Sequence, residues 1–178
     1  TSPYAYYQFW LNAADSDVPK FLRIFTLLPE STVAAAVAAH EAEPGKRDGH
    51  RLLAAQATAL LHGPTEAAQA EAASNALFSG DISGLSAVML NEVFAAVPRS
   101  DHPKSTLEGE GVRVVDLLTQ IGLATSGREA KEFLNSGSVT ANGRKLGIDD
   151  RLKTTDLLEG GVIAIRRGKK NWHLTRWQ

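Results

Sequence analysis

Apolar residues recur at helical spacing through the first hundred residues of the chain. Val18, Phe21, Leu22 and Phe25, for example, stand at i, i+3, i+4 and i+7, which places them on one face of a helix. Gly and Pro interrupt the pattern and mark the helix ends. The pattern predicts an all-helical bundle over residues 1–97, with helices beginning after Ser2-Pro3 and running over about 15–28, 31–42, 47–62, 65–79 and 86–96.

The pattern breaks down over residues 98–111. This stretch, PRSDHPKSTLEGEG, is polar, contains Pro and Gly, and has no apolar periodicity. Such a composition is typical of an interdomain linker. We therefore expect two domains, over residues 1–97 and 112–178.

The last segment begins with two helical patterns. Val114, Leu117, Leu118 and Ile121 share one helix face, and Gly122 follows as a stop signal. A second helix is expected over 126–135, where Ser126 and Glu129 have the spacing of a capping box.

Two hairpins follow these helices. Asn142-Gly143 favours a two-residue type I′ turn between strands near Val139 and Leu146. For the last hairpin we expect Gly168-Lys169 at the turn, so that Ile165 faces Trp172. The sequence thus predicts an α+β protein overall, in which a small α+β domain of two helices and short hairpins follows the helical bundle.

Charge is unevenly divided between the two parts. The net charge of −1 for the 178 residues combines 7 Lys+Arg against 11 Asp+Glu in residues 1–104 with 12 against 9 in residues 105–178. A basic module joined to an acidic one favours a polyanionic partner, and nucleic acid is the leading candidate.

The cations of the basic module lie in a helix and two hairpins, where they can contact RNA phosphates. They are Arg128, Lys131, Arg144, Lys145, Arg166, Arg167, Lys169 and Lys170. Each phosphate that they neutralise would release counterions and make binding sensitive to salt. The alternative is an ordinary solvated charged face. Trp172 and Trp177 could stack on bases, although Trp172 is expected to lie in the core.

Signals for catalysis are weak. The chain has no cysteine, which excludes disulfides and thiolate metal sites, and its five histidines lack metal-ligand spacing. No phosphate-binding glycine loop or nucleophile elbow is present, so we expect no catalytic residue and no metal site. No apolar run is long enough for a membrane helix, no signal peptide is recognised, and a cytoplasmic location is expected.

Several segments resemble the C-terminal part of bacterial-type tyrosyl-tRNA synthetases. The similar segments are TSPYAYYQFW at 1–10, FLRIFT at 21–26, LLHG at 60–63, ALFSGD at 76–81 and the terminal IRRGKKNW at 165–172. Residues 111–146 are similar to the small RNA-binding module that these enzymes share with a ribosomal protein and some pseudouridine synthases.

The resemblance implies an anticodon-binding helical domain and a module that packs on the anticodon stem and variable arm of tyrosine tRNA. It implies phosphate contacts from the eight cations and, more weakly, anticodon-proximal roles for Asp15, Asp17 and Arg23. The ATP- and Mg²⁺-dependent attachment of tyrosine would belong to a catalytic domain upstream, through which the full enzyme would form a homodimer, with the fragment a monomer. The alternatives are a stand-alone ribosome-associated RNA binder and a protein-interaction bundle.

Overall fold

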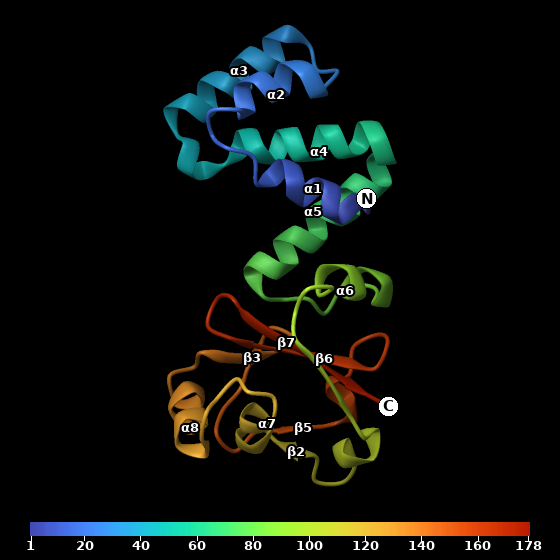
Figure 1. Cartoon of the computed structure of the whole chain (residues 1–178), viewed down its shortest axis with the longest axis vertical. Coiled ribbons are helices and arrows are strands. Elements are labelled where there is room, and N and C mark those ends of the chain that lie inside the picture. The colour runs from blue at the N-terminus through green and yellow to red at the C-terminus, as the bar shows by residue number, and fades with distance from the viewer. The chain divides into compact units, whose positions relative to one another are not determined.

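The computed structural model describes residues Thr1–Gln178 and divides them into two compact units. The first unit is Thr1–Asn75 and the second is Ala76–Gln178 (Figure 1). Helices come first and a mixed sheet follows, so the predicted α+β class is confirmed. None of the helices combines the length and the apolar composition that a membrane span requires.

The first unit is a bundle of helices, as the periodicity predicts. Ser2 caps the first of them by accepting a hydrogen bond from the backbone N–H of Ala5, at 3.1 Å. Tyr7, Trp10, Leu22 and Leu53 are buried between the helices. The helices are α1 (Pro3–Leu11), α2 (Val18–Phe25), α3 (Glu30–Ala42), α4 (Asp48–His62) and α5 (Pro64–Ser79), with a short 3₁₀ turn η1 (Pro44–Lys46). The end of α5, residues 76–79, belongs to the second unit.

The second unit is built on a five-stranded sheet with the order β1-β7-β6-β3-β4. Its strands are β1 (Arg99–His102), β3 (Val139–Ala141), β4 (Arg144–Lys145), β6 (Val162–Arg167) and β7 (Asn171–Trp177). A smaller pair joins β2 (Val112–Arg113) to β5 (Arg151–Leu152). The helical segments are α6 (Ala87–Val93), α7 (Val114–Gln120), α8 (Gly127–Asn135), η2 (Lys104–Leu107) and η3 (Thr154–Asp156).

Both faces of this sheet are covered. Ile163 and Ile165 point into a core made with α7 and α8, while Val162 and Ala164 point into a second core with α6. Figure 1 shows α6 over one face and α7 and α8 over the other. Because successive side chains of a strand alternate between faces and both faces are covered, the first four residues of β6, 162–165, form a continuous apolar run.

The predicted boundary and linker at residues 98–111 are therefore wrong. The segment contains β1, which pairs in parallel with β7 from Arg99–Leu174 to His102–Trp177. The α6 segment also belongs to the second unit, because Leu90 and Phe94 pack on the sheet rather than on the bundle. Parallel pairing between segments so distant in sequence leaves no pattern in the local sequence. In addition, an edge strand made of polar residues has the composition of a loop.

The predicted register of the last hairpin is also wrong, by one residue. Ile165 faces His173 and Arg166 faces Trp172, and residues 168–170 form a three-residue connection with Gly168 at φ 64°. The predicted register put the two large apolar side chains Ile165 and Trp172 opposite each other. The sheet buries side chains on both of its faces, so alternation alone could not set the register.

Arg166 and Arg167, at the end of β6, pack against aromatic rings. The Arg166 guanidinium carbon lies 5.0 Å from the Trp172 ring centroid. The Arg167 guanidinium carbon lies 4.7 Å from the Phe133 ring centroid, and its Nη1 donates a 2.8 Å hydrogen bond to the carbonyl of Leu123. The Arg167 contacts fasten the sheet to α8 and to the loop before it, whereas the Arg166 contact lies within the β6–β7 hairpin.

Two buried histidines tie β1 to β7. The Ser100 hydroxyl lies 2.7 Å from His102 Nε2 and 2.8 Å from His173 Nε2, and the His102 ring stacks on Trp177. Burial lowers the pKa of His102, against a weaker opposing effect of Asp101. Burial, followed by the charge of His102, lowers the pKa of His173. Both rings are therefore held neutral near pH 7.

Acid is expected to destabilise the second unit through these rings. The pKa of both histidines is lower in the folded chain than the ordinary value of 6.5. As the pH is lowered below 6.5, the unfolded chain therefore binds more protons than the folded chain, and the free energy of unfolding decreases. Denaturant unfolding between pH 7.5 and 5 measures this loss. His173→Gln, which can still bond Ser100, should show a shallower loss than the parent. An identical pH slope would contradict the assignment.

The packing of Arg167 predicts a role in stability. Arg167→Met keeps an apolar stem but removes the hydrogen bond and the cation–π contact, and should lower the free energy of unfolding by about 1–3 kcal/mol. Lys169→Met, in the exposed connection after β6, is the matched control and should change stability by less than about 0.5 kcal/mol. Equal effects in urea unfolding would count against this role of Arg167.

Candidate nucleic-acid interface

Three strands bring separate basic segments to one end of the second unit's sheet. Val139 at the start of β3 pairs with Arg167 at the end of β6, and Leu146 after β4 donates its N–H to the carbonyl of Val139. The N–H of Gly168 donates to the carbonyl of Ser138 at 2.7 Å. We call this place the basic end of the sheet; it comprises Lys145, the turn 136–138 and the connection 168–170.

The turn 136–138 contacts the other two segments of the basic end, Lys145 and the connection 168–170. It links α8 to β3, and its Gly137, at φ 66°, lies against Lys145: a Cβ on that glycine would be 4.0 Å from the Lys145 Nζ. The Ser136 and Ser138 hydroxyls both donate to the carbonyl of Phe133 at 2.9 Å. This turn was not among the predicted contact residues, although its Ser-Gly-Ser sequence between a helix and a strand is typical of a turn.

The four lysines among the eight cations are exposed and make no ion pair. Lys145, Lys169 and Lys170 belong to the basic end, and Lys131 lies on α8, which leads into it. Strands β4, β3 and β6 are neighbours about 4.8 Å apart, so Lys145 stands about 10 Å across the sheet from the β6–β7 connection. These ammonium groups are available to an external anion.

The four arginines are engaged within the protein. Arg128 Nε pairs with Glu132 Oε1 at 3.1 Å on the exposed face of α8. Arg144 pairs with Asp156 at 3.1 Å and with Asp150 at 3.6 Å. Arg166 and Arg167 are half-buried in the aromatic contacts described above. The predicted set thus falls into two groups: the lysines are unpaired, and the arginines already have partners within the protein.

The N-terminus of α8 differs in detail from the predicted capping box. Ser126 accepts a hydrogen bond from the backbone N–H of Glu129 at 3.2 Å, as expected. Glu129 accepts instead from the backbone N–H and the hydroxyl of Thr125. These hydrogen bonds hold the Glu129 pKa below its usual value. The carboxylate is therefore committed to fixing the helix start.

Neither candidate tryptophan is free for stacking on a base. Trp177 is 3% exposed, stacks on His102 with ring centroids 4.6 Å apart, and donates from Nε1 to the Thr175 hydroxyl. Trp172 is half-buried between Phe94 and Arg166. Recognition at this surface would therefore fall to charge and hydroxyl groups.

The three weaker candidates of the first unit do not form one site. The Asp15 carboxylate lies 3.3 Å from His50 Nε2. Asp17 occupies the N-cap position of α2 without a side-chain hydrogen bond. Arg23 donates to the carbonyl of Pro19 and lines a groove with Leu28, Glu30, Val33 and Ala34.

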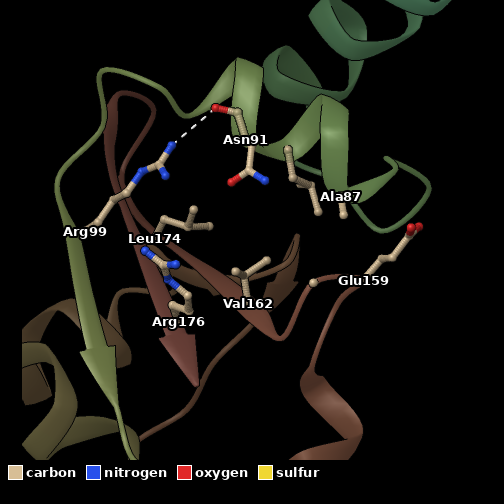
Figure 2. A pocket seen from close by; sticks show the side chains of 9 residues that line it. Ala87, Asn91, Arg99, Glu159, Val162, Leu174 and Arg176 are labelled. Atoms are coloured by element: carbon tan, nitrogen blue, oxygen red, sulfur yellow. Dashed lines mark hydrogen bonds between the residues drawn. The ribbon is translucent and has the colours of Figure 1, made fainter. Parts of the chain in front are cut away.

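A small pocket of about 80 Å³ lies between α6 and the sheet of the second unit. Figure 2 shows Arg99 and Arg176 on one side of it and Glu159 on the other. Arg99 donates to the carbonyl of Asn91, and Arg176 pairs with Asp101 at 3.0 Å. The volume is far below the roughly 300 Å³ at which small-molecule sites begin, so a nucleotide does not fit here.

Two family models match this chain. Residues 1–79 match "tRNA synthetases class I (W and Y)", and residues 92–175 match "Tyrosine--tRNA ligase SYY-like C-terminal domain". Among curated proteins, a tyrosine–tRNA ligase of Aliivibrio fischeri is 41% identical over the whole chain and 41% of its own length. A tyrosine–tRNA ligase of Roseiflexus castenholzii is 36% identical over 99% of the chain and 42% of its own length.

One of the similar solved structures is a tyrosyl-tRNA synthetase C-terminal domain. It is 36% identical, with a TM-score of 0.43, over 57% of this chain and 98% of its own. The chain spans about two fifths of the length of the curated relatives that it matches. From the two family models and the identity along the whole chain, the chain belongs to the tyrosine–tRNA ligase family and corresponds to the C-terminal part of its members.

Proposed function

We propose that this chain is the tRNA-recognition portion of a tyrosine–tRNA ligase. The observation that carries the proposal is the convergence of Lys145, Lys169 and Lys170 at one end of the sheet, in a chain of this family. Unpaired ammonium groups on a rigid sheet end are suited to a row of phosphates. The helical first unit would contact the anticodon region, and the second unit the anticodon stem and variable arm.

The lysines would position the tRNA without reading its sequence. Phosphate contacts fix the register and orientation of a bound nucleic acid, while base contacts specify it. The Ser136 hydroxyl, in the turn beside Lys145, donates its proton to the carbonyl of Phe133, and its oxygen can still accept a hydrogen bond from a ribose 2′-OH. Arg128 and Arg144 would join only by exchanging their carboxylate partners for phosphate, so their net contribution would be smaller.

We assign the chemical step to the part of the ligase that this chain does not span. We infer that the full enzyme uses ATP and Mg²⁺ to activate tyrosine and then transfers it to tyrosine tRNA, outside the residues described here. We also infer that subunit pairing in the full enzyme involves that remaining part, and that this chain alone is a monomer.

Charge reversal at the β6–β7 connection tests the phosphate contacts. Lys169→Glu with Lys170→Glu should weaken binding of tyrosine tRNA about equally for all tRNA sequences. It should also reduce the slope of log K against log[salt] by roughly one to two units. Filter binding between 50 and 300 mM salt measures both.

Lys104→Glu is the matched control for this pair of substitutions. Lys104 follows β1, and its N–H bonds the carbonyl of Gln178 beyond the far end of β7 from the connection. The control should keep the parent salt slope. An unchanged slope in the double variant, or an equal change in the control, would rule out the connection as a contact.

The choice of RNA tests which molecule the surface recognises. A tyrosine tRNA with a shortened variable arm should bind on the order of tenfold more weakly than the intact tRNA, since part of the phosphate row is lost. Competition filter binding with a ribosomal RNA fragment completes the test. Preference for that fragment would favour a ribosome-associated protein, and no RNA binding would favour a protein-interaction bundle.

A further inference from the structure

Three metal-ligating side chains from separate elements meet in the first unit. Asp15 belongs to the connection between α1 and α2, His40 to the last turn of α3 and His50 to the first turn of α4. One possible ligand atom from each residue lies within 4.8 Å of those from the other two. Sequence spacing gave no sign of this, because the cluster forms only when the helices pack.

Each imidazole is fixed by one backbone carbonyl. His40 Nε2 lies 2.9 Å from the carbonyl oxygen of Asp15, and His50 Nε2 lies 3.0 Å from that of Ala13. Because a carbonyl oxygen only accepts, each neutral ring carries its proton on Nε2. A histidine that ligates a metal is oriented in this way, with one ring N–H donated to a carbonyl or carboxylate.

The other nitrogen of each ring is an unused electron-pair donor. The Nδ1 atoms of His40 and His50 are buried and have no hydrogen-bond partner. The two side chains are 3% and 0% exposed, so water does not readily satisfy them. Buried polar atoms without partners are rare in folded proteins, and a missing ion is one physical explanation for them.

The packing around the cluster holds the rings together. The ring centroids of His40 and His50 are 5.2 Å apart in an edge-to-face arrangement. Gly49 permits this approach, because a Cβ there would lie 3.1 Å from His40 and 3.0 Å from Val18.

Asp15 supplies the negative charge of the cluster, and it is the one member that is exposed to solvent, from which an ion can enter. Its Oδ1 lies 3.3 Å from His50 Nε2, the proton-bearing nitrogen, and the carboxylate is 63% exposed, so it is free to rotate toward Nδ1 to share an ion with it. Zn²⁺ in a tetrahedral site is about 2.0–2.2 Å from nitrogen and oxygen ligands, which sets the ligands about 3.3–3.5 Å apart. One possible ligand atom of each side chain lies within 4.8 Å of the other two, so the three groups would have to approach one another to reach this spacing.

We propose that Asp15, His40 and His50 form a binding site for a divalent transition-metal ion, with Zn²⁺ as the ion that fits best. Two imidazoles and one carboxylate suit Zn²⁺, Co²⁺ or Ni²⁺, whereas Mg²⁺ and Ca²⁺ prefer oxygen ligands. Three protein ligands leave a fourth position for water. The ion would fasten the α1–α2 connection to α3 and α4, independently of RNA binding.

Calorimetric titration of the chelator-treated chain with Zn²⁺ tests the site. We expect one ion per chain, a higher Tm with Zn²⁺ than without it, and no comparable binding of Mg²⁺. Co²⁺ at the same site should give the visible absorption of a tetrahedral complex. A chain that binds no Zn²⁺ at 100 µM would overturn the proposal.

Variants separate this site from incidental surface binding. Asp15→Asn alters an exposed group and should fold normally while lowering Zn²⁺ affinity at least tenfold. Asp17→Asn, two residues away and outside the cluster, is the matched control and should bind as the parent does. His50→Gln should abolish both the Co²⁺ absorption and the Tm rise; if this variant does not fold, Asp15→Asn decides alone. Equal affinity in Asp15→Asn and the parent would overturn the proposal.

Discussion

The pairing of β6 with β7 is the interaction on which the second unit depends. Six residue pairs, from Val162–Arg176 to Arg167–Asn171, place apolar side chains on both faces of the hairpin. One face closes the core with α7 and α8, and the other closes the core with α6. The same pairing carries β1 on one side and β3 on the other, so the basic end keeps its shape only while this register holds.

Local patterns along the chain predicted most of the elements. Helical spacing indicated the helices of the first unit, and Asn142-Gly143 indicated the β3–β4 hairpin, where both residues have positive φ. The errors came from non-local contacts. The parallel pairing of Arg99 with Leu174, and the burial of Phe94 against the sheet, depend on segments far apart in sequence. No periodicity in residues 86–111 could reveal them.

For the candidate site, too, local sequence predicted one part and non-local packing determined the rest. Residue type and charge selected eight cations, and the structure shows why they are not equivalent. Lysines at turns project into solvent, whereas the planar guanidinium of Arg167 finds an aromatic ring and a carbonyl nearby. The His40–His50 contact is the extreme case, because nothing in their ten-residue separation predicts that two helix ends meet. Sequence identifies chemical groups, and packing decides which of them remain available.

The role of the basic end in tRNA binding can be measured by the reactivity of its lysines with and without tyrosine tRNA. Acetylation followed by mass spectrometry reports each ammonium group separately. If the basic end binds the phosphates, tRNA will protect Lys145, Lys169 and Lys170 together, while Lys104 beyond the opposite end of β7 will keep its reactivity. Protection of Lys104 with continued reactivity at the basic end would show that tRNA binds elsewhere on the chain.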